Sequence, residues 1–323
     1  MCIELPFDPF PLFKGSHRQT IFSSLISRPV EPISKTFFVT LPDDDCLALE
    51  ETIPSDWSDS DPTVLMLHGL CGSHSSPYLV RMTHHLEEKG IRSLRMNFRG
   101  CGSGKGKAKS LYHAGQSDDV KEVLKVIKNN TPHSPIVLIG FSMGGNVALK
   151  LAGELADQAD RYFNAVISVV PPVDLLSSVN MFATSSGKMY EKYFLKILKA
   201  DIDYRCSLFT DLPKVNFPKK MRFFDFDNLY TAPFGGFENA LDYYNRASSK
   251  KVVQNIDLPC KILFSEDDPL VSSTSLDDTL LPSNIEVYKT KRGGHMGFLT
   301  APTKERTIFW LDHILMDWIQ QGL

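Results

Sequence analysis

Residues 136–147 read IVLIGFSMGGNV, and this segment constrains the fold more than any other part of the chain. The apolar run at its start has the composition of a strand buried on both faces, whereas 143–157 is an amphipathic stretch of helical length. Between them, Ser142 is flanked at two-residue distance by Gly140 and Gly144, small residues that let the backbone crowd into a sharp turn. The pattern predicts a strand, a tight turn and a helix, with the serine hydroxyl exposed at the turn.

Apolar runs and amphipathic segments alternate along most of the chain. Residues 35–41 and 46–52 flank an acidic turn and are typical of a β-hairpin. Further strands are expected at 63–69, 91–98, 135–140, 164–170, 260–265 and 285–290. Amphipathic helices are expected at about 76–89, 117–129, 143–157 and 303–319. A hairpin followed by alternating strands and helices predicts an α/β fold, with a mostly parallel sheet, an antiparallel N-terminal hairpin and helices on both faces.

The alternation lapses between residues 172 and 250. This segment is dense in phenylalanine and tyrosine, contains several prolines, and shows no clean strand period. Such a pattern predicts an insertion of short helices and loops rather than an independent domain. We therefore expect one domain over residues 1–323, with residues 172–250 as a helical cap inserted in it.

Composition excludes several classes of protein. The formal net charge is −3, so the chain lacks the basic character of a nucleic-acid-binding protein. No apolar run reaches the length of a membrane span, and the start MCIELPFDPFPLFKGSHRQT is broken by prolines and has acids where a signal peptide would have lysines. We expect a cytoplasmic protein with no integral span, for which peripheral contact with a membrane stays open. The six cysteines are scattered without paired spacing, which predicts neither a disulfide framework nor a zinc site.

A serine at such a turn becomes a nucleophile only when a base removes its proton and an acid holds that base. On sheets of the α/β-hydrolase kind, the acid follows a late strand and the histidine lies in the loop after the last strand. The last two expected strands lead into SEDDPLV and KRGGHMGFL. The chain order therefore predicts Ser142 as nucleophile, Asp268 as acid and His295 as base.

One alternative for the acid stays open. Asp267 precedes Asp268, and two adjacent side chains on a turn point in different directions, so the sequence does not decide which one faces the histidine. For His295 the choice is clearer, because three nearby glycines suggest a backbone bent to deliver one ring.

The tetrahedral oxyanion of such a reaction needs two hydrogen-bond donors. We expect them to be the backbone N–H of Met143, the residue after the nucleophile, and that of Leu70 in HGLCG. His68 in the same segment is interpreted as a brace for the loop. Cys71 is interpreted as a small packed thiol rather than a redox group.

No cofactor or metal is expected. The glycine-rich segment 98–106 resembles a phosphate loop, but Gly106 follows Lys105 where serine or threonine is needed. His84 and His85 are adjacent on an expected helix, so their side chains point about 100° apart and do not form the pair that a metal requires.

Seven segments together resemble the YheT-like branch of the α/β-hydrolase superfamily, which includes bacterial YheT-type hydrolases, yeast medium-chain fatty acid ester synthases and mammalian ABHD-type lipid esterases. They are SHRQTI (16–21), HGLCGS (68–73), MNFRGCGSG (96–104), GFSMGGN (140–146), DFDNLYTAPFGGFENALDYYNRAS (225–248), DDPLV (267–271) and GGHMGF (293–298). The likeness runs nearly end to end, and the first and fifth segments are the more specific to the branch. It implies Ser142, Asp268 and His295 as nucleophile, acid and base, and it implies carboxylic ester hydrolysis, in some members of lipid esters, or acyl transfer to an alcohol.

The function expected from these observations is that of a serine carboxylic-ester hydrolase. It would form an acyl-enzyme without a cofactor and act on a small ester with a medium-length acyl chain or on a lipid ester. An acyltransferase that forms esters from an alcohol is the first alternative. Haloperoxidase or lyase chemistry on the same residues and a non-catalytic scaffold are further ones. The oligomeric state is not determined by the sequence.

Overall fold

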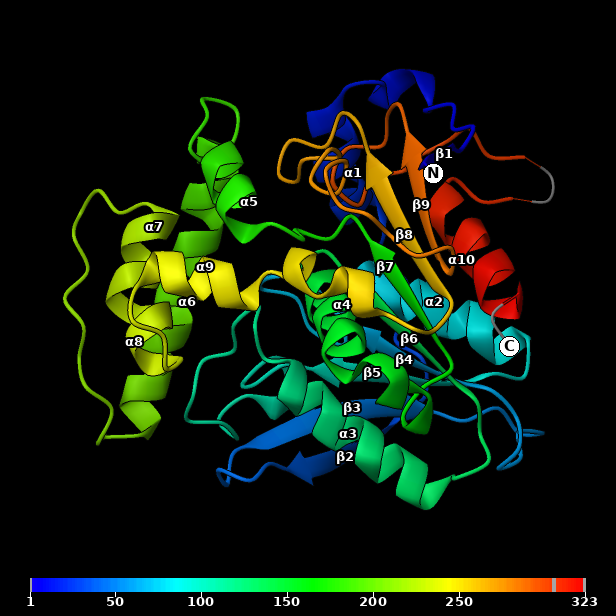
Figure 1. Ribbon diagram of the computed structural model, residues 1–323, viewed down its shortest axis with the longest axis horizontal. Coiled ribbons are helices and arrows are strands. Elements are labelled where there is room, and N and C mark those ends of the chain that lie inside the picture. Colours follow the sequence, from blue (N-terminus) through cyan, green and yellow to red (C-terminus); the bar gives the residue numbers. More distant parts are fainter. Residues whose placement is uncertain (1, 304–305, 322–323) are drawn as a thin grey trace.

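The computed structural model describes residues 2–303 and 306–321, and the strands in that part of the chain form one nine-stranded sheet (Figure 1). Its order is β1-β9-β8-β7-β6-β4-β5-β3-β2. The strands are β1 (Cys2–Glu4), β2 (Lys35–Thr40), β3 (Cys46–Thr52), β4 (Thr63–Leu67), β5 (Arg92–Asn97), β6 (Ile136–Phe141), β7 (Ala165–Val169), β8 (Cys260–Ser265) and β9 (Ile285–Thr290). The predicted α/β architecture is confirmed, and each predicted strand is present within one or two residues of its expected ends.

The direction of the strands also follows the prediction. β2 and β3 form the antiparallel hairpin, and β3 continues antiparallel beside β5. β4 to β9 pair in parallel with their neighbours. β1 was not predicted: it adds a parallel strand beside β9, with Cys2 opposite Val287. Its three residues are too few to show a strand period in the sequence.

Helices cover both faces of this sheet. Outside the insertion they are α1 (Ser16–Ile26), α2 (Pro77–Glu88), α3 (Ser117–Asn130), α4 (Met143–Leu155) and α10 (Trp310–Gln321), with short 3₁₀ turns η1 (Pro11–Phe13), η2 (Gly102–Gly104) and η3 (Ala156–Arg161). Leu65 of β4 points into the core shared with α3 and α4. The next residue, Met66, points into the core shared with α2 and α10. Because successive side chains of a strand alternate between faces, β4 is apolar on both sides, as expected for a strand covered by helices on both faces.

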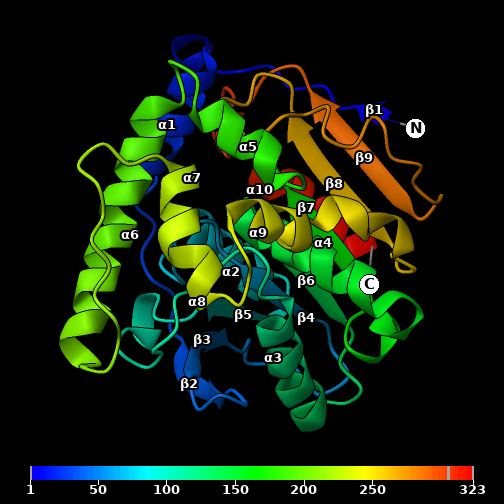
Figure 2. The same ribbon diagram turned by 60° about the vertical axis from the view of Figure 1, so that its left-hand side comes forward.

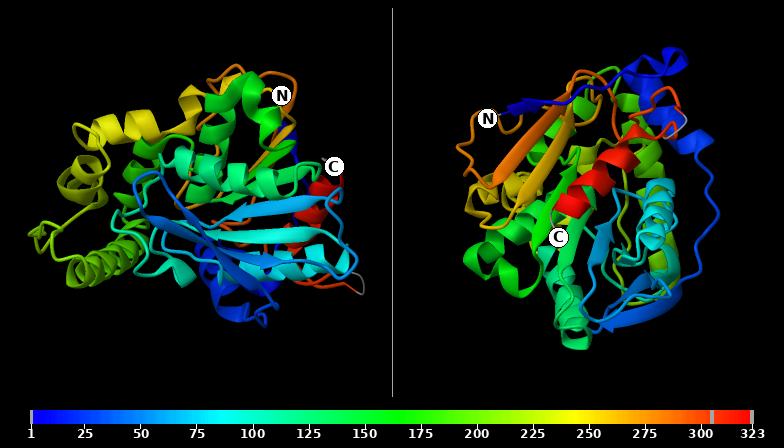
Figure 3. Two further views of the ribbon diagram at one scale, coloured as in Figure 1. Left: turned by 90° about the horizontal axis from the view of Figure 1, so that it is seen from below. Right: turned by 90° about the vertical axis from the view of Figure 1, so that its right-hand side faces the viewer.

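Two features of the N- and C-terminal segments differ from the prediction. α1 lies before the first predicted strand and was not expected as a helix, and Figure 3 shows the chain running from it along the outside of the molecule to β2. The last helix was expected from residue 303 but begins at Trp310, because Phe309 forms an isolated β-bridge with Leu299. Residues 304 and 305 of that expected helix lie outside the described part of the chain. No helix within residues 2–303 and 306–321 is long and apolar enough to cross a membrane.

Between β7 and β8 the chain leaves the sheet and forms a group of helices beside it (Figures 1 and 2). They are α5 (Leu175–Phe182), α6 (Lys188–Leu208), α7 (Phe223–Phe226), the π-helical turn η4 (Asp227–Thr231), α8 (Ala232–Phe234), α9 (Ala240–Ala247), η5 (Ser249–Lys251) and η6 (Val253–Asn255). At 21 residues, α6 is longer than the short helices that the sequence suggested. The assignment of residues 172–250 as a cap inserted in one domain stays a prediction.

Arg205 joins this insertion to the sheet domain. Its side chain is 2% exposed, and its guanidinium donates hydrogen bonds to the carbonyl oxygens of Ala108 (2.8 Å), Ser110 (2.6 Å) and Arg99 (2.7 Å). Asp201, one turn earlier on α6, pairs with its Nε at 2.7 Å. A buried guanidinium with all these partners satisfies three carbonyl groups of the loop after β5 at once.

We predict that Arg205→Met destabilises the protein by about 3 kcal/mol or more, because three carbonyl groups, two of them in buried hydrogen bonds, and Asp201 lose their donor. The measurement is the free energy of unfolding in urea. Lys196→Met, at an exposed position of the same helix, is the matched control. Equal unfolding free energies for the two variants would contradict the anchoring role.

Candidate active site

Ser142 occupies the turn between β6 and α4. Its backbone angles are φ 52° and ψ −120°, a conformation that residues with a side chain rarely adopt. The N–H of Ser142 donates to the carbonyl oxygen of Val169 on the neighbouring β7 at 2.8 Å, which holds the turn in place. With this backbone conformation, the hydroxyl of Ser142 projects from the turn that follows the carboxyl end of β6.

The two glycines around Ser142 permit close packing of backbone. A Cβ on Gly140 would lie 2.2 Å from the carbonyl oxygen of Gly144. A Cβ on Gly144 would lie 2.6 Å from the carbonyl oxygens of both Leu67 and His68. Because the obstructing atoms belong to the backbone, a side chain at either position would displace the turn. This is the crowding that the sequence pattern predicted.

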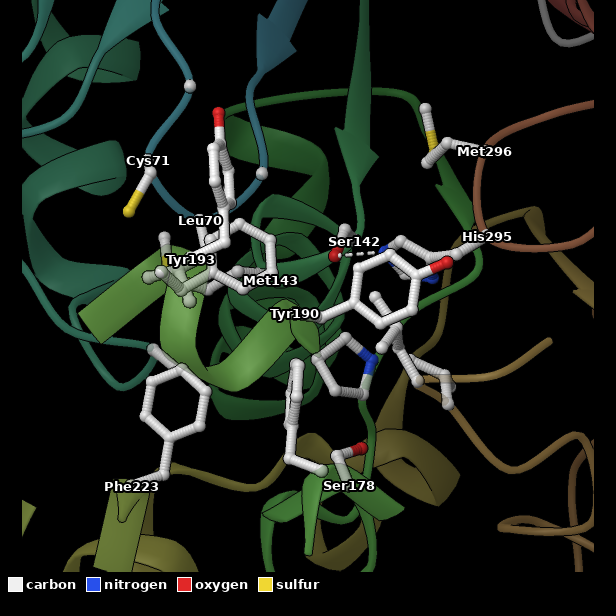
Figure 4. Close-up of a pocket in the computed structure, with 18 of the residues that line it drawn as sticks. Leu70, Cys71, Ser142, Met143, Ser178, Tyr190, Tyr193, Phe223, His295 and Met296 are labelled. Carbon is white, nitrogen blue, oxygen red and sulfur yellow. Dashed lines mark hydrogen bonds between the residues drawn. The ribbon is translucent and has the colours of Figure 1, made fainter. Parts of the chain in front are cut away.

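The side chains of Ser142, His295 and Asp268 form a continuous hydrogen-bonded chain, and Figure 4 shows its contact between Ser142 and His295. Nε2 of His295 lies 2.8 Å from Oγ of Ser142, and its Nδ1 lies 2.8 Å from Oδ2 of Asp268. Since a carboxylate only accepts, Nδ1 carries the ring proton and Nε2 is left to accept from the serine hydroxyl. Loops after three separate strands thus meet at one edge of the sheet.

The carboxylate of Asp268 is held on both of its oxygens. Its side chain is 1% exposed. Oδ1 accepts from the backbone N–H groups of Leu270 at 2.7 Å and Val271 at 3.0 Å, which leaves Oδ2 for His295. These amides fix the direction from which the carboxylate approaches the ring.

Asp267, the competing candidate for the acid, points elsewhere. Its Oδ1 accepts from Oγ of Ser265 at 2.7 Å and from the N–H of Gly294 at 2.8 Å. The structure therefore places Asp268 against the ring of His295 and Asp267 against the backbone of the same loop. Both carboxylates therefore contact the histidine loop: Asp268 accepts from the ring of His295, and Asp267 accepts from the backbone N–H of Gly294.

Helix α1 supports the histidine loop, which sequence reasoning did not foresee. The N–H of His295 donates to Oγ1 of Thr20 at 2.9 Å, and that hydroxyl donates to the carbonyl of Ser16 at 2.8 Å. Gln19 is fully buried and bonds both the carbonyl (3.0 Å) and the N–H (2.6 Å) of Leu299. In the sequence, Gln19 and Thr20 stood out only as part of SHRQTI, a segment that supported the family resemblance without indicating what these residues do. These contacts give the Gln-Thr pair a structural role in the loop.

The glycines around His295 fit against this helix. A Cβ on Gly294 would lie 2.4 Å from the carbonyl oxygen of Ser16, and one on Gly297 would lie 2.7 Å from backbone carbon of Gln19. Gly294 also has φ of 59°, in the left-handed region that favours glycine. The glycines therefore serve the bend that the sequence suggested and, in addition, the close approach of α1.

Leu70 and Met143, the expected oxyanion donors, both lie beside Ser142 in the cavity (Figure 4). The N–H of Met143 is the first of helix α4, where amides have no partner within the helix. Within residues 2–303 and 306–321, neither N–H has a hydrogen-bond acceptor. Two donors are thus available next to the serine hydroxyl.

Tyrosine hydroxyls hold the loop on either side of Leu70. The hydroxyl of Tyr78 accepts from the N–H of Gly69 at 3.0 Å, and that of Tyr112 accepts from the N–H of Cys71 at 2.8 Å. The flanking amides are therefore occupied while the N–H between them is left available. Such preorganised donors cost no rearrangement when charge develops on a substrate oxygen.

His68 and Cys71 have the structural roles that were expected. Nδ1 of His68 donates to the carbonyl of Gly69 at 2.7 Å, and Nε2 accepts from the N–H of Phe98 at 3.2 Å. Burial lowers the pKa of His68 to about 4, so the ring is neutral at pH 7 and braces the loop. Burial raises the pKa of Cys71 to about 12, so this group remains a packed thiol rather than a reactive thiolate.

Ser142 and His295 open into a cavity of about 610 Å³. The helices of the insertion supply much of its wall, and Figure 4 shows Tyr190, Tyr193 and Phe223 facing the same space as Ser142. Further apolar residues in the wall are Leu175, Val179, Phe182, Phe194, Leu198 and Phe226. The cavity wall is therefore mostly apolar, and its polar groups include Ser142 and His295 as well as Asp227 and Thr231 of the insertion.

Asp227 is a buried carboxylate in the wall of this cavity, and the sequence did not single it out. It accepts hydrogen bonds from Thr231 at 2.6 Å and from the hydroxyl of Tyr244 at 2.7 Å. Burial raises the pKa of Asp227 to about 6, which the two hydrogen bonds only partly offset. The side chain ties the π-helical turn to α9.

A family model described as the alpha/beta hydrolase fold matches residues 62–302. The parallel sheet and the Ser142 turn are those of an α/β hydrolase, and the chain belongs to that family, within its YheT-like branch. The predicted family is thereby confirmed.

Relatives of known name support this assignment. The YheT esterase of Escherichia coli (strain K12) is 28% identical over 97% of this chain and 92% of its own length. A monoacylglycerol lipase of Saccharomyces cerevisiae is 28% identical over 74% of this chain and 55% of its own length. The human phospholipase ABHD3 is 25% identical over 83% of this chain and 68% of its own length. The chain is thus a hydrolase of the carboxylesterase and lipase type.

Solved structures share the fold. The Pyrococcus furiosus esterase Pf2001 superposes with a TM-score of 0.57 at 18% identity, covering 91% of this chain and 99% of that protein. Est1E from Butyrivibrio proteoclasticus, solved with ferulic acid, superposes with a TM-score of 0.58 at 15% identity, covering 88% of this chain and 98% of that protein. At these identities the likeness shows the architecture alone.

The buried Asp227 generates a prediction about stability and pH. Its pKa is higher in the folded protein than in the unfolded chain, so folding favours the protonated form, and this contribution to stability is lost as pH rises from 4 through 6. Relative to Asp227→Asn, wild-type stability should fall by about 2 kcal/mol between pH 4 and pH 7, because at pH 4 the carboxyl of the unfolded chain is already partly ionised. Urea unfolding at several pH values measures this difference, with the exposed Asp203→Asn as control. Parallel pH curves for wild type and Asp227→Asn would show that burial does not shift this carboxyl.

Proposed function

We propose that this chain hydrolyses carboxylic esters through an acyl-enzyme formed on Ser142. The observation that carries the proposal is the hydrogen-bonded chain from Ser142 through His295 to Asp268 at one end of an apolar cavity. A hydroxyl, an imidazole and a buried carboxylate in this order are the groups that acyl transfer needs.

In the first half-reaction, Oγ of Ser142 attacks the ester carbonyl while Nε2 of His295 takes the hydroxyl proton. Asp268 holds the ring and stabilises the imidazolium that forms. The carbonyl oxygen becomes an oxyanion, for which the N–H groups of Leu70 and Met143 are the proposed donors. His295 then returns the proton to the alcohol oxygen as the bond to the acyl carbon breaks.

In the second half-reaction, water takes the place of the alcohol. His295 removes a proton from this water, whose oxygen attacks the acyl carbon of the ester on Ser142. Collapse of the second tetrahedral intermediate releases a carboxylic acid, and His295 returns the proton to Ser142. No cofactor takes part in either step.

A medium-length acyl chain or a lipid ester is the proposed substrate. The cavity of about 610 Å³ has a mostly apolar wall, which suits an acyl chain better than a polar group. Names of relatives point the same way, since they include a monoacylglycerol lipase and the phospholipase ABHD3. We propose that residues 172–250 form the cap that encloses the acyl chain of the substrate.

Acyl transfer to an alcohol is the second candidate function. It uses the same acyl-enzyme and differs only in the nucleophile that attacks it. A relative 28% identical over 74% of this chain is named medium-chain fatty acid ethyl ester synthase/esterase 2, from Saccharomyces cerevisiae, and this chain covers 58% of it. Ethyl ester formed in the presence of ethanol, relative to free acid, measures the preference.

The first experiment is hydrolysis of p-nitrophenyl esters from acetate to palmitate by wild type and by Ser142→Ala. We expect the variant to lose at least about a thousandfold in kcat, because no other group would carry the acyl intermediate. Ser178→Ala is the matched control, since Ser178 is another serine of the cavity wall. Equal rates in wild type and Ser142→Ala would reject the mechanism and favour a non-catalytic scaffold. The preferred ester would measure the usable length of the cavity.

The support of His295 by α1 generates a second prediction. Thr20→Val keeps the shape of the side chain but removes the acceptor for the N–H of His295. We expect kcat to fall about tenfold with little change in KM, because a displaced ring misaligns proton transfer while valine keeps the shape that Thr20 gives to the cavity wall. Thr20→Ser retains the hydroxyl and should restore kcat. A Thr20→Val variant with wild-type kcat would show that α1 does not position the ring.

A further inference from the structure

The mouth of the cavity lies between α1 and α6. Leu25 of α1 and Met189 and Tyr193 of α6 line the cavity, yet their exposed fractions are 55%, 54% and 60%. Side chains that face both the cavity and the solvent mark its rim. The two helices are in contact here, because Nδ1 of His17 on α1 lies 2.9 Å from the hydroxyl of Tyr190 on α6.

Apolar side chains continue outward from this rim onto the surface. Leu12 of η1 is 67% exposed, and Phe22 and Ile26 of α1 are 38% and 42% exposed. Phe22 and Ile26 are four residues apart and so lie on the same side of the helix. We use the name rim surface for the exposed apolar residues around the mouth, which are Leu12, Phe22, Leu25, Ile26, Met189 and Tyr193. Exposed apolar side chains gathered at the mouth of a cavity are typical of an interaction site.

Positive charge accompanies the rim surface on both helices. Residues 9–30 contain Lys14, Arg18 and Arg28, all exposed, and no aspartate or glutamate. On α6, Lys188 and Lys192 are exposed beside Met189 and Tyr193.

Glu191, which lies in the same turn of α6, does not neutralise the positive charge of Lys188 and Lys192. Glu191 is buried and paired with Arg222 at 2.5 Å. The whole protein has a net charge of −3, so the cations around the mouth form a positive region on an otherwise acidic protein.

We propose that the rim surface docks on an anionic lipid bilayer, with the cavity mouth facing the lipid. Exposed apolar side chains can enter the boundary between headgroups and acyl chains, while lysine and arginine pair with lipid phosphates. A lipid ester could then pass from the bilayer into the cavity without crossing water. The purpose of the docking rests on the proposed function, but the docking itself is measurable without any hydrolysis.

The experiment is co-sedimentation of the Ser142→Ala protein with vesicles, so that no lipid is consumed. One set of vesicles is pure phosphatidylcholine, and the other contains equal parts of phosphatidylcholine and phosphatidylglycerol. We expect the bound fraction on anionic vesicles to correspond to an affinity at least about tenfold higher than on neutral ones, and to fall as salt rises. Protein that stays in the supernatant with both vesicles would overturn the proposal.

Two double variants test the two components of the surface. Leu12→Glu with Ile26→Glu removes apolar groups, and Lys14→Glu with Arg18→Glu reverses two charges; none of these four residues lines the cavity. Both should lose vesicle binding in the Ser142→Ala background, and in the otherwise wild-type protein both should hydrolyse a short soluble ester at the unaltered rate. Vesicle binding that survives the apolar pair of substitutions would overturn insertion of the rim surface.

Matched controls lie away from the mouth. Leu280→Glu changes a side chain that is 94% exposed in the loop leading to the amino end of β9, and Lys89→Glu reverses an exposed charge after α2. Both should bind anionic vesicles like the parent protein, and a comparable loss in either would overturn a localised docking surface. Vesicle binding by a protein that hydrolyses no soluble ester would reject the proposed function while supporting the docking.

Discussion

The backbone around Ser142 packs so closely that no side chain fits at Gly140 or Gly144, and the candidate site is built around this contact. Carbonyl groups from the end of β4 and from the start of α4 occupy the space that a Cβ would need. The packing holds Ser142 at a positive φ and brings the loop after β4 next to the serine. The available N–H groups of Leu70 and Met143 therefore lie near its hydroxyl because the same glycines bring their two segments together.

Polar contacts from the N-terminal helix complete the same arrangement. The histidine loop packs Phe298 into the core, and hydrogen bonds with Thr20 and Gln19 hold its backbone on one side while Asp267 holds it on another. Through His17 and Tyr190 the same helix also contacts the insertion. One short helix thus joins the histidine loop, the mouth of the cavity and the long helix α6.

The insertion is attached to the sheet domain by buried polar groups as well as by apolar packing. Arg205 spans from α6 to three carbonyls of the loop after β5, and Asn146 of α4 donates to the carbonyls of Ala114 and Ala247. Buried donors and acceptors must be paired with correct geometry, so these contacts specify one position of the insertion more sharply than apolar packing does. The cavity between the two parts has a defined shape for this reason.

The sequence by itself determined the alternation of strands and helices, the turn at Ser142 and the order in which serine, aspartate and histidine follow one another. These features depend on periodicity and on small residues within a few positions of one another. The tertiary structure alone decided which of Asp267 and Asp268 contacts the ring of His295, that Thr20 contacts the backbone of His295, and that Asp227 is buried in the cavity wall. The bond between His295 and Thr20 joins residues 275 positions apart, and such a contact depends on how the whole chain packs. Local patterns carry no information about which distant backbone segments will approach each other, so these contacts follow from the folded structure alone.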